Sequence, residues 1–134
     1  MKRTVLLIDN DEISIFVNTR LLEKKGRCSH CHVARNGQEA LEYFLDCQSQ
    51  NRALPDLVFL DVNMPLIDAH EFLYQYERME LKDKDKVRVI LLSTDPSKIR
   101  GKRKDHFVLA EIVKPLTMEK LDHLFELLDK NAEG

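Results

Sequence analysis

The sequence predicts an α/β fold in which a five-stranded parallel sheet carries helices on both faces. Short apolar, β-prone runs recur along the 134 residues, and segments with helical periodicity follow them. Alternating strands and helices need crossover connections, and right-handed crossovers place helices on both faces of a parallel sheet. Polar residues stand directly after several of the runs, where parallel sheets carry their ligand sites.

The central strand is predicted from residues 57–60, four apolar residues that lead directly into Asp61. This run is too short to span a membrane, and Pro65 follows soon after it. Proline cannot continue a hydrogen-bonded ladder, so the strand must end here. Asp61 is therefore expected at the end of a buried strand.

Three other predicted strands end in the same way. Residues 5–8 lead into Asp9, residues 89–92 into Ser93 and Thr94, and residues 112–113 into Lys114. The carboxyl ends of parallel strands meet at one edge of the sheet, so we expect these groups to converge there. Asp9 alone would suggest a helix cap and Lys114 alone a surface residue, but the four strand-end groups together favour a functional site.

The first helix is expected after Asp9 and is ended by Gly26. Its apolar face is predicted at helical spacing, with Arg20, Glu23 and Lys24 toward solvent. Residues 28–34 are short and polar, which is typical of an edge strand. The residues of the predicted apolar face are Ile13, Phe16, Val17 and Leu21.

Asn36 and Asp68 are the expected N-caps of the second and third helices, each followed by glutamate at the third helical position. The apolar faces of these two helices are predicted to be Ala40, Leu41, Phe44 and Leu45, and Phe72, Leu73, Tyr76 and Met79.

The helix after Asp95 is expected to be short and weakly anchored, because residues 97–104 contain one apolar residue among many basic ones. Residues 108–113 form the fifth predicted strand. Thr117 then caps a last helix, and residues 131–134 are expected to be a frayed tail. The inward residues of this last helix are predicted to be Met118, Leu121, Leu124, Phe125 and Leu128.

Length and composition fit one domain with a single core, too short for an additional output domain. The net charge of −2 disfavours wholesale binding of nucleic acid. Neither a signal peptide nor a membrane helix is visible, so we expect a cytoplasmic protein that does not enter membranes. The three cysteines suggest free thiols.

The strand-end pattern resembles the receiver domain of two-component response regulators. The resemblance rests on Asp9, on Asp61 with Met64-Pro65, on Ser93, and on Lys114-Pro115, in this order. It covers residues 2–128 and implies strand order 2-1-3-4-5. We therefore expect residues 1–134 to form one stand-alone receiver domain, similar to the chemotaxis regulators.

Asp61 is the expected phosphoacceptor, because a carboxylate can form a covalent acyl phosphate. The incoming group is negative, so a divalent ion is needed, and the expected cofactor is Mg²⁺ held by Asp9 and Asp61. The resemblance implies that the Asn63 carbonyl completes the protein ligands. It also implies that Lys114 and the Ser93 hydroxyl contact the phosphoryl oxygens, and that Lys114-Pro115 is a cis peptide.

Two positions depart from the family pattern. Receivers usually carry a second acid next to the first, in direct contact with the metal, and here Asn10 takes its place. Asp11 and Glu12 are candidates to compensate through water. Glu111 stands where the family usually has the aromatic residue that moves when the hydroxyl engages phosphate.

The basic run of residues 98–104 lies beside Ser93 in the sequence. It is either a solvated face or a docking patch for an acidic partner, and nucleic acid is disfavoured because no aromatic residues interleave it. If it pairs with Glu111, partner binding would be electrostatic, sensitive to salt, and disrupted by charge reversal at Lys102 and Arg103.

Cys28, Cys31 and His32 match the C-x-x-C-H signature of c-type haem attachment. Haem is disfavoured because attachment needs an exported, unfolded chain. Zinc bound by the thiols with His30 or His32 is also disfavoured, since a strand points neighbouring side chains to opposite faces.

The function predicted from these observations is that of a signalling switch rather than an enzyme. A histidine kinase or phosphotransfer protein phosphorylates Asp61, and the output is a change in binding to an unknown protein. The alternative is a phospho-independent pseudo-receiver, favoured by Asn10 and Glu111. A phosphatase with an aspartate nucleophile would need a second acid at Asn63.

Overall fold

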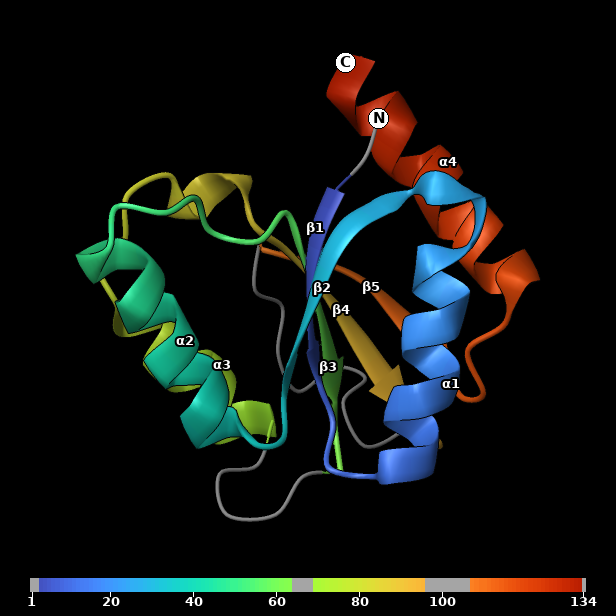
Figure 1. Ribbon diagram of the computed structural model, residues 1–134, viewed down its shortest axis with the longest axis horizontal. Helices are drawn as coiled ribbons and strands as arrows, with labels where there is room; N and C mark the ends of the chain where they lie inside the picture. The colour runs from blue at the N-terminus through green and yellow to red at the C-terminus, as the bar shows by residue number, and fades with distance from the viewer. Residues whose placement is uncertain (1–2, 64–68, 96–106, 134) are drawn as a thin grey trace.

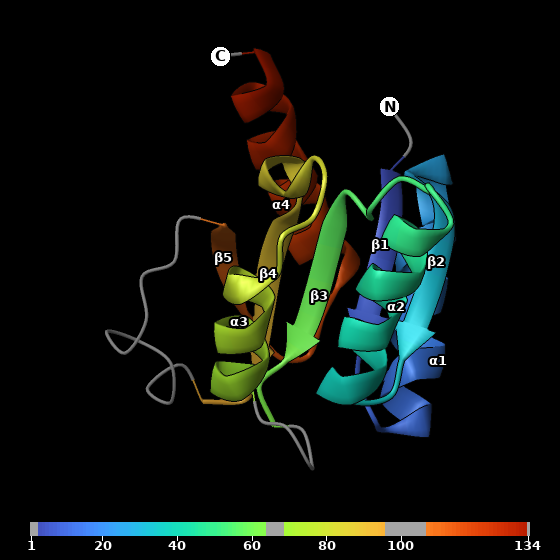
Figure 2. The same cartoon turned by 90° about the vertical axis from the view of Figure 1, so that its left-hand side faces the viewer.

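The computed structural model describes residues 3–63, 69–95 and 107–133. Five parallel strands form one sheet in the order β2-β1-β3-β4-β5, which confirms the predicted fold class and topology. β3 occupies the centre of the sheet, and β2 and β5 form its edges (Figure 2). The strands are β1 (Arg3–Ile8), β2 (Cys28–Ala34), β3 (Leu57–Asp61), β4 (Arg88–Ser93) and β5 (Val108–Val113).

Helices cover both faces of the sheet. α2 and α3 lie on one face, and α1 and α4 lie on the other (Figure 1). Within the described ranges, no helix is long and apolar enough to cross a bilayer. The expected cap Asp68 and the helix expected after Asp95 fall on residues outside those ranges. The helices are α1 (Glu12–Glu23), α2 (Gly37–Ser49), α3 (Ala69–Arg78) and α4 (Met118–Glu133), with short 3₁₀ turns at Lys24–Gly26 and Lys84–Lys86.

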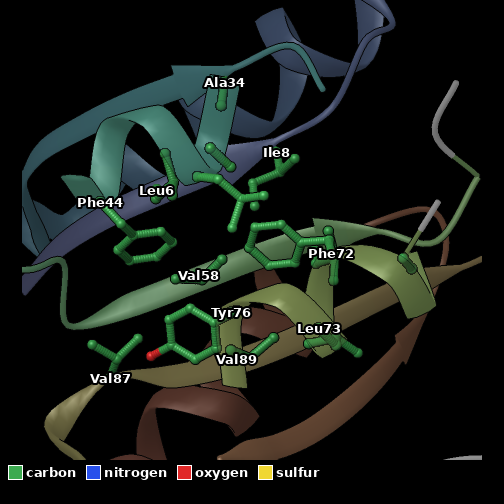
Figure 3. Packing of buried hydrophobic residues seen from close by; sticks show 14 of the residues in the cluster. Leu6, Ile8, Ala34, Phe44, Val58, Phe72, Leu73, Tyr76, Val87 and Val89 are labelled. Carbon is green, nitrogen blue, oxygen red and sulfur yellow. The ribbon is translucent and has the colours of Figure 1, made fainter. Parts of the chain in front are cut away.

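The core has two layers because the central strands are buried on both faces. Along β3, Val58 and Leu60 face α2 and α3, whereas Leu57 and Phe59 belong to the cluster under α1 and α4. This explains why the strand appears in the sequence as a continuous apolar run. The rings of Phe44, Phe72 and Tyr76 lie in the first layer (Figure 3) and are at most 1% exposed.

Three of the predicted caps set where helices begin or end. The Asn36 side chain accepts a hydrogen bond from the Glu39 amide at 2.9 Å, and the Thr117 hydroxyl accepts one from the Lys120 amide at 3.2 Å. Gly26 adopts a φ of 64°, a left-handed conformation that favours glycine and closes the turn after α1.

Three of the four residues predicted for the apolar face of α1 are exposed, and only Leu21 packs against the core. Ile13, Phe16 and Val17 are 75%, 59% and 44% exposed. The buried stripe of the helix runs instead through Ile15, Asn18 and Leu22. These residues are spaced by three and four, as the period of a helix requires, but a polar residue in the middle of the stripe conceals it in the sequence.

Two smaller expectations also fail. Leu45 is 56% exposed, because the buried face of α2 continues from Phe44 to Cys47. The last helix extends to Glu133, so residues 131–133 belong to α4 and do not form the expected tail.

Candidate functional site

The carboxyl ends of the strands gather the residues that the sequence marks as functional. Asp61 is the last residue of β3 and Ser93 the last of β4, while Asp9 and Lys114 directly follow β1 and β5. Asp9 and Ser93 are fully buried and Asp61 is 3% exposed. The strands β1, β3 and β4 are adjacent in the sheet, so these side chains share one edge (Figure 2).

Lys114 forms an ion pair with Asp61. Its Nζ lies 2.9 Å from Asp61 Oδ1, and the Asn63 backbone N–H donates to the same oxygen at 3.0 Å. The Lys114 backbone N–H donates to the Ser93 carbonyl at 2.9 Å, which fixes the end of β5 against β4. The peptide bond between Lys114 and Pro115 is cis, as expected.

Burial raises the pKa of the Asp61 carboxyl above its ordinary value. The hydrogen bonds from Lys114 and Asn63 and the positive charge of Lys114 act in the opposite direction, while the nearby negative charge of Asp9 raises this pKa further. Desolvation and the second carboxylate therefore both disfavour the charge on Asp61. A bound cation would relieve both effects.

Asp9 is held by two donors from the start of α1. The Asp11 backbone N–H donates to Asp9 Oδ1 at 2.9 Å, and the Ser14 hydroxyl donates to Asp9 Oδ2 at 2.7 Å. The buried Asn18 amide in turn donates to the Ser14 hydroxyl at 3.2 Å. Ser14 and Asn18 were not predicted from the sequence, although their spacing of four residues places both on one side of the helix.

Replacing Ser14 by alanine is expected to destabilise the protein by about 1.5–3 kcal/mol, the range for a hydrogen bond to a charged group. The substitution removes a donor from the buried Asp9 and also an acceptor from the Asn18 amide. Urea unfolding followed by circular dichroism measures the change. Ser49→Ala, on the exposed end of α2, is the control and should change stability far less; equal values for the two variants would contradict the proposed role of Ser14.

Some of the remaining predicted residues make other contacts or are exposed, and some lie outside the described ranges. The Ser93 hydroxyl donates to the Asp95 carbonyl at 2.8 Å and accepts from the Asp95 N–H at 3.0 Å. Asn10 and Thr94 are exposed, and Glu111 is exposed on β5. Lys102, Arg103 and the rest of the basic run lie outside the described residues, so their pairing with Glu111 stays a prediction.

The donor set at this edge suits a hard divalent cation. Among residues 3–63, 69–95 and 107–133, no group of three or more His, Cys, Asp or Glu side chains could hold a metal. Asp9 and Asp61 could supply two carboxylates to such an ion, with a backbone carbonyl and water completing the shell. Mg²⁺ is bound in this way, whereas zinc prefers nitrogen and sulfur ligands.

Comparison with known proteins identifies a family that this chain matches. The family model described as "Response regulator receiver domain" matches residues 5–126. A "Probable methanogenesis regulatory protein FilR2" of Methanothrix harundinacea is 30% identical over 122 residues, covering 91% of this chain and 78% of that protein. A glutamate methylesterase/glutamine glutaminase of Methanospirillum hungatei matches only 48% of this chain and 17% of its own length.

Solved structures of other proteins show the same fold. A two-component response regulator from Cytophaga hutchinsonii superposes with a TM-score of 0.84 at 28% identity, covering 97% of this chain and 99% of that one. A two-component response regulator from Legionella pneumophila gives a TM-score of 0.79 at 24% identity, with 96% and 99% coverage, and supports the fold.

Proposed function

The chain belongs to the response regulator receiver family of two-component signalling, and from this premise we propose that Asp61 accepts a phosphoryl group. A histidine kinase or phosphotransfer protein would be the donor, in the cytoplasm. The output would be altered binding to a downstream protein. The observation that carries the proposal is the buried Asp61 carboxylate paired with Lys114 at 2.9 Å.

The contacts of Asp61 support different tasks for its two oxygens. Lys114 and the Asn63 N–H both contact Oδ1, so Oδ2 is the nucleophile in our proposal. Oδ2 attacks phosphorus, the bond between phosphorus and the donor's imidazole nitrogen breaks, and the product is an acyl phosphate. Lys114, already beside Asp61, then contacts the transferred phosphoryl oxygens as a point charge.

Mg²⁺ would be held by Asp9, Asp61 and the Asn63 carbonyl. Bound there, it neutralises negative charge on the phosphoryl oxygens. The Asp11 N–H and the Ser14 hydroxyl hold Asp9 in a fixed orientation. Each carboxylate oxygen offers about two lone-pair sites, so these hydrogen bonds leave room for a metal.

Asn10→Asp is expected to strengthen Mg²⁺ binding roughly tenfold. Asn10 is exposed, so the added charge acts in a high dielectric, where about 1 kcal/mol per pair of unit charges at 4 Å applies, or at most about 2 kcal/mol for a divalent ion. Calorimetric titration with MgCl₂ measures the affinity. Gln50→Glu adds the same charge to another exposed position and should have no effect; unchanged affinity in Asn10→Asp would show that Asp11 or Glu12 already fills the role.

An exposed apolar patch beside the site supports a protein donor. Ile13, Phe16 and Val17 form this patch on α1. Ile13 and Val17 also line a cavity of about 240 Å³ that reaches Lys114. A partner that covers the patch would bring its phosphohistidine close to Asp61.

Acetyl phosphate tests the proposal without a partner. With Mg²⁺, the purified protein should gain one phosphoryl group, and chelation of the metal with EDTA should prevent the gain. The alternative, a constitutive pseudo-receiver, is favoured by the neutral Asn10 and predicts no labelling under either condition.

A further inference from the structure

The edge strand β2 contains an irregularity that the sequence does not reveal. Arg3 of β1 pairs with Cys28, but the next residue, Thr4, pairs with His30. Ser29 is therefore an extra residue, as in a β-bulge, and it shifts the alternation of side chains by one position. This corrects the expectation that a regular strand would separate the neighbouring thiols.

As a result, Cys28 and Cys31 lie on the same face of β2. Both pack against the apolar cluster under α1 and α4, and the Cys28 thiol donates a hydrogen bond to the His30 carbonyl at 3.1 Å. Both side chains are partly exposed, so small molecules can reach them.

The spacing along the strand is compatible with a disulfide. Cys28 and Cys31 stand opposite Arg3 and Val5, which are two positions apart on β1. Two positions correspond to about 6.6 Å along a parallel strand, and bridged cysteines have Cα atoms roughly 4.4–6.8 Å apart. In a regular strand the separation would be three positions, about 10 Å, which is too long for a disulfide.

Other ligands do not complete a metal site around these thiols. The His32 ring stacks on Tyr43 of α2 with centroids 4.1 Å apart, which places it on the opposite face of the sheet. Cys47 is buried in α2, also on that face. Within the described residues, no third metal-binding side chain joins the pair.

We propose that Cys28 and Cys31 form a dithiol modification site that small disulfides of the glutathione class oxidise to an intrachain disulfide. The Cys28 thiolate attacks one sulfur of the small disulfide, whose bond breaks and releases one thiolate. The Cys31 thiolate then attacks Cys28 Sγ and releases the second. Two protein thiols are oxidised, two small thiols are produced, and the protein protons pass to the leaving thiolates.

The two thiols differ in their readiness to react. Burial raises the pKa of both thiols, that of Cys31 to about 12, while the His30 backbone and then Cys31 act to lower the pKa of Cys28. Cys28 is therefore assigned the first attack, and Cys31 the resolving step. Because the thiolate is the nucleophile, the reaction should accelerate as pH rises above neutral.

The test is incubation of the reduced, folded protein with oxidised glutathione, followed by acid quenching and mass spectrometry with peptide mapping. We expect a disulfide between Cys28 and Cys31 that exceeds the glutathione adduct by at least about tenfold, because the bulge places the resolving thiol on the same face of β2. Cys47→Ser should behave like wild type. Cys31→Ser should accumulate a glutathione adduct on Cys28.

A second test uses only the wild-type protein, so it does not depend on whether the variants fold. Phenylarsine oxide binds pairs of adjacent thiols, so one equivalent should bind the folded wild-type protein and protect both cysteines from alkylation. An unresolved glutathione adduct in wild type, thiols inert to oxidised glutathione, or failure of the arsenical to protect both cysteines would overturn the proposal. None of these measurements depends on phosphorylation of Asp61, so their failure would leave the proposed function untouched.

Discussion

Asp61→Asn should abolish labelling by acetyl phosphate in the presence of Mg²⁺. The asparagine amide has no nucleophilic carboxylate oxygen, while its similar size preserves the packing around the end of β3. The measurement is the intact mass of the folded variant after incubation. Because burial and Asp9 both raise the pKa of Asp61, the neutral side chain removes an unfavourable buried charge and the variant should fold well.

Asp56→Asn is the matched control for this experiment. Asp56 lies just before the opposite end of β3, where its carboxylate accepts a hydrogen bond from the Thr4 backbone N–H at 2.9 Å. The control removes a carboxylate from the same strand region without touching the site, and it should label like wild type. Labelling of Asp61→Asn at the wild-type rate would mean that another residue accepts the phosphoryl group.

Lys114→Met is expected to reduce the labelling rate by about 10- to 100-fold. The ammonium group donates to Asp61, and a charge-assisted hydrogen bond of this kind contributes roughly 1.5–3 kcal/mol. Without it, the buried carboxylate loses the positive charge and hydrogen bond that lower its pKa, so its pKa rises further. The rate is measured as the slope of phosphoprotein mass signal against time at fixed acetyl phosphate.

Lys130→Met removes an exposed lysine from α4 and controls for the loss of one positive charge. It should leave the rate unchanged. Lys114→Arg distinguishes charge from shape, because a bulkier guanidinium would not fit as a point charge beside Asp61. Equal rates for Lys114→Met and Lys130→Met would exclude Lys114 from the transfer step.

The strand ends were predictable because their signal is local. A buried parallel strand is a continuous apolar run, and the first polar residue after it marks the edge where ligands bind. Asp61 and Asp9 are found where this reasoning places them. Asn36 and Thr117 were predictable as caps for the same reason, since a cap depends on three or four neighbouring residues.

The features that were missed depend on contacts between distant segments. The packing of α1 against the sheet selects Ile15, Asn18 and Leu22, and a polar residue inside the stripe hides that choice. The Ser14 hydroxyl can donate to Asp9 only once α1 has formed and packed beside the end of β1. The bulge at Ser29 arises from pairing with Arg3, and single-strand periodicity cannot reveal it.

Chemical trapping of the phosphorylated residue tests the central claim most directly. Borohydride reduces an aspartyl phosphate to homoserine, so wild-type protein treated with acetyl phosphate and Mg²⁺ and then reduced should carry homoserine at position 61. Peptide mapping by tandem mass spectrometry locates the conversion. Homoserine at residue 61 and at no other aspartate is the predicted result; conversion at a different aspartate, or none in a protein that has gained phosphate, would contradict the account.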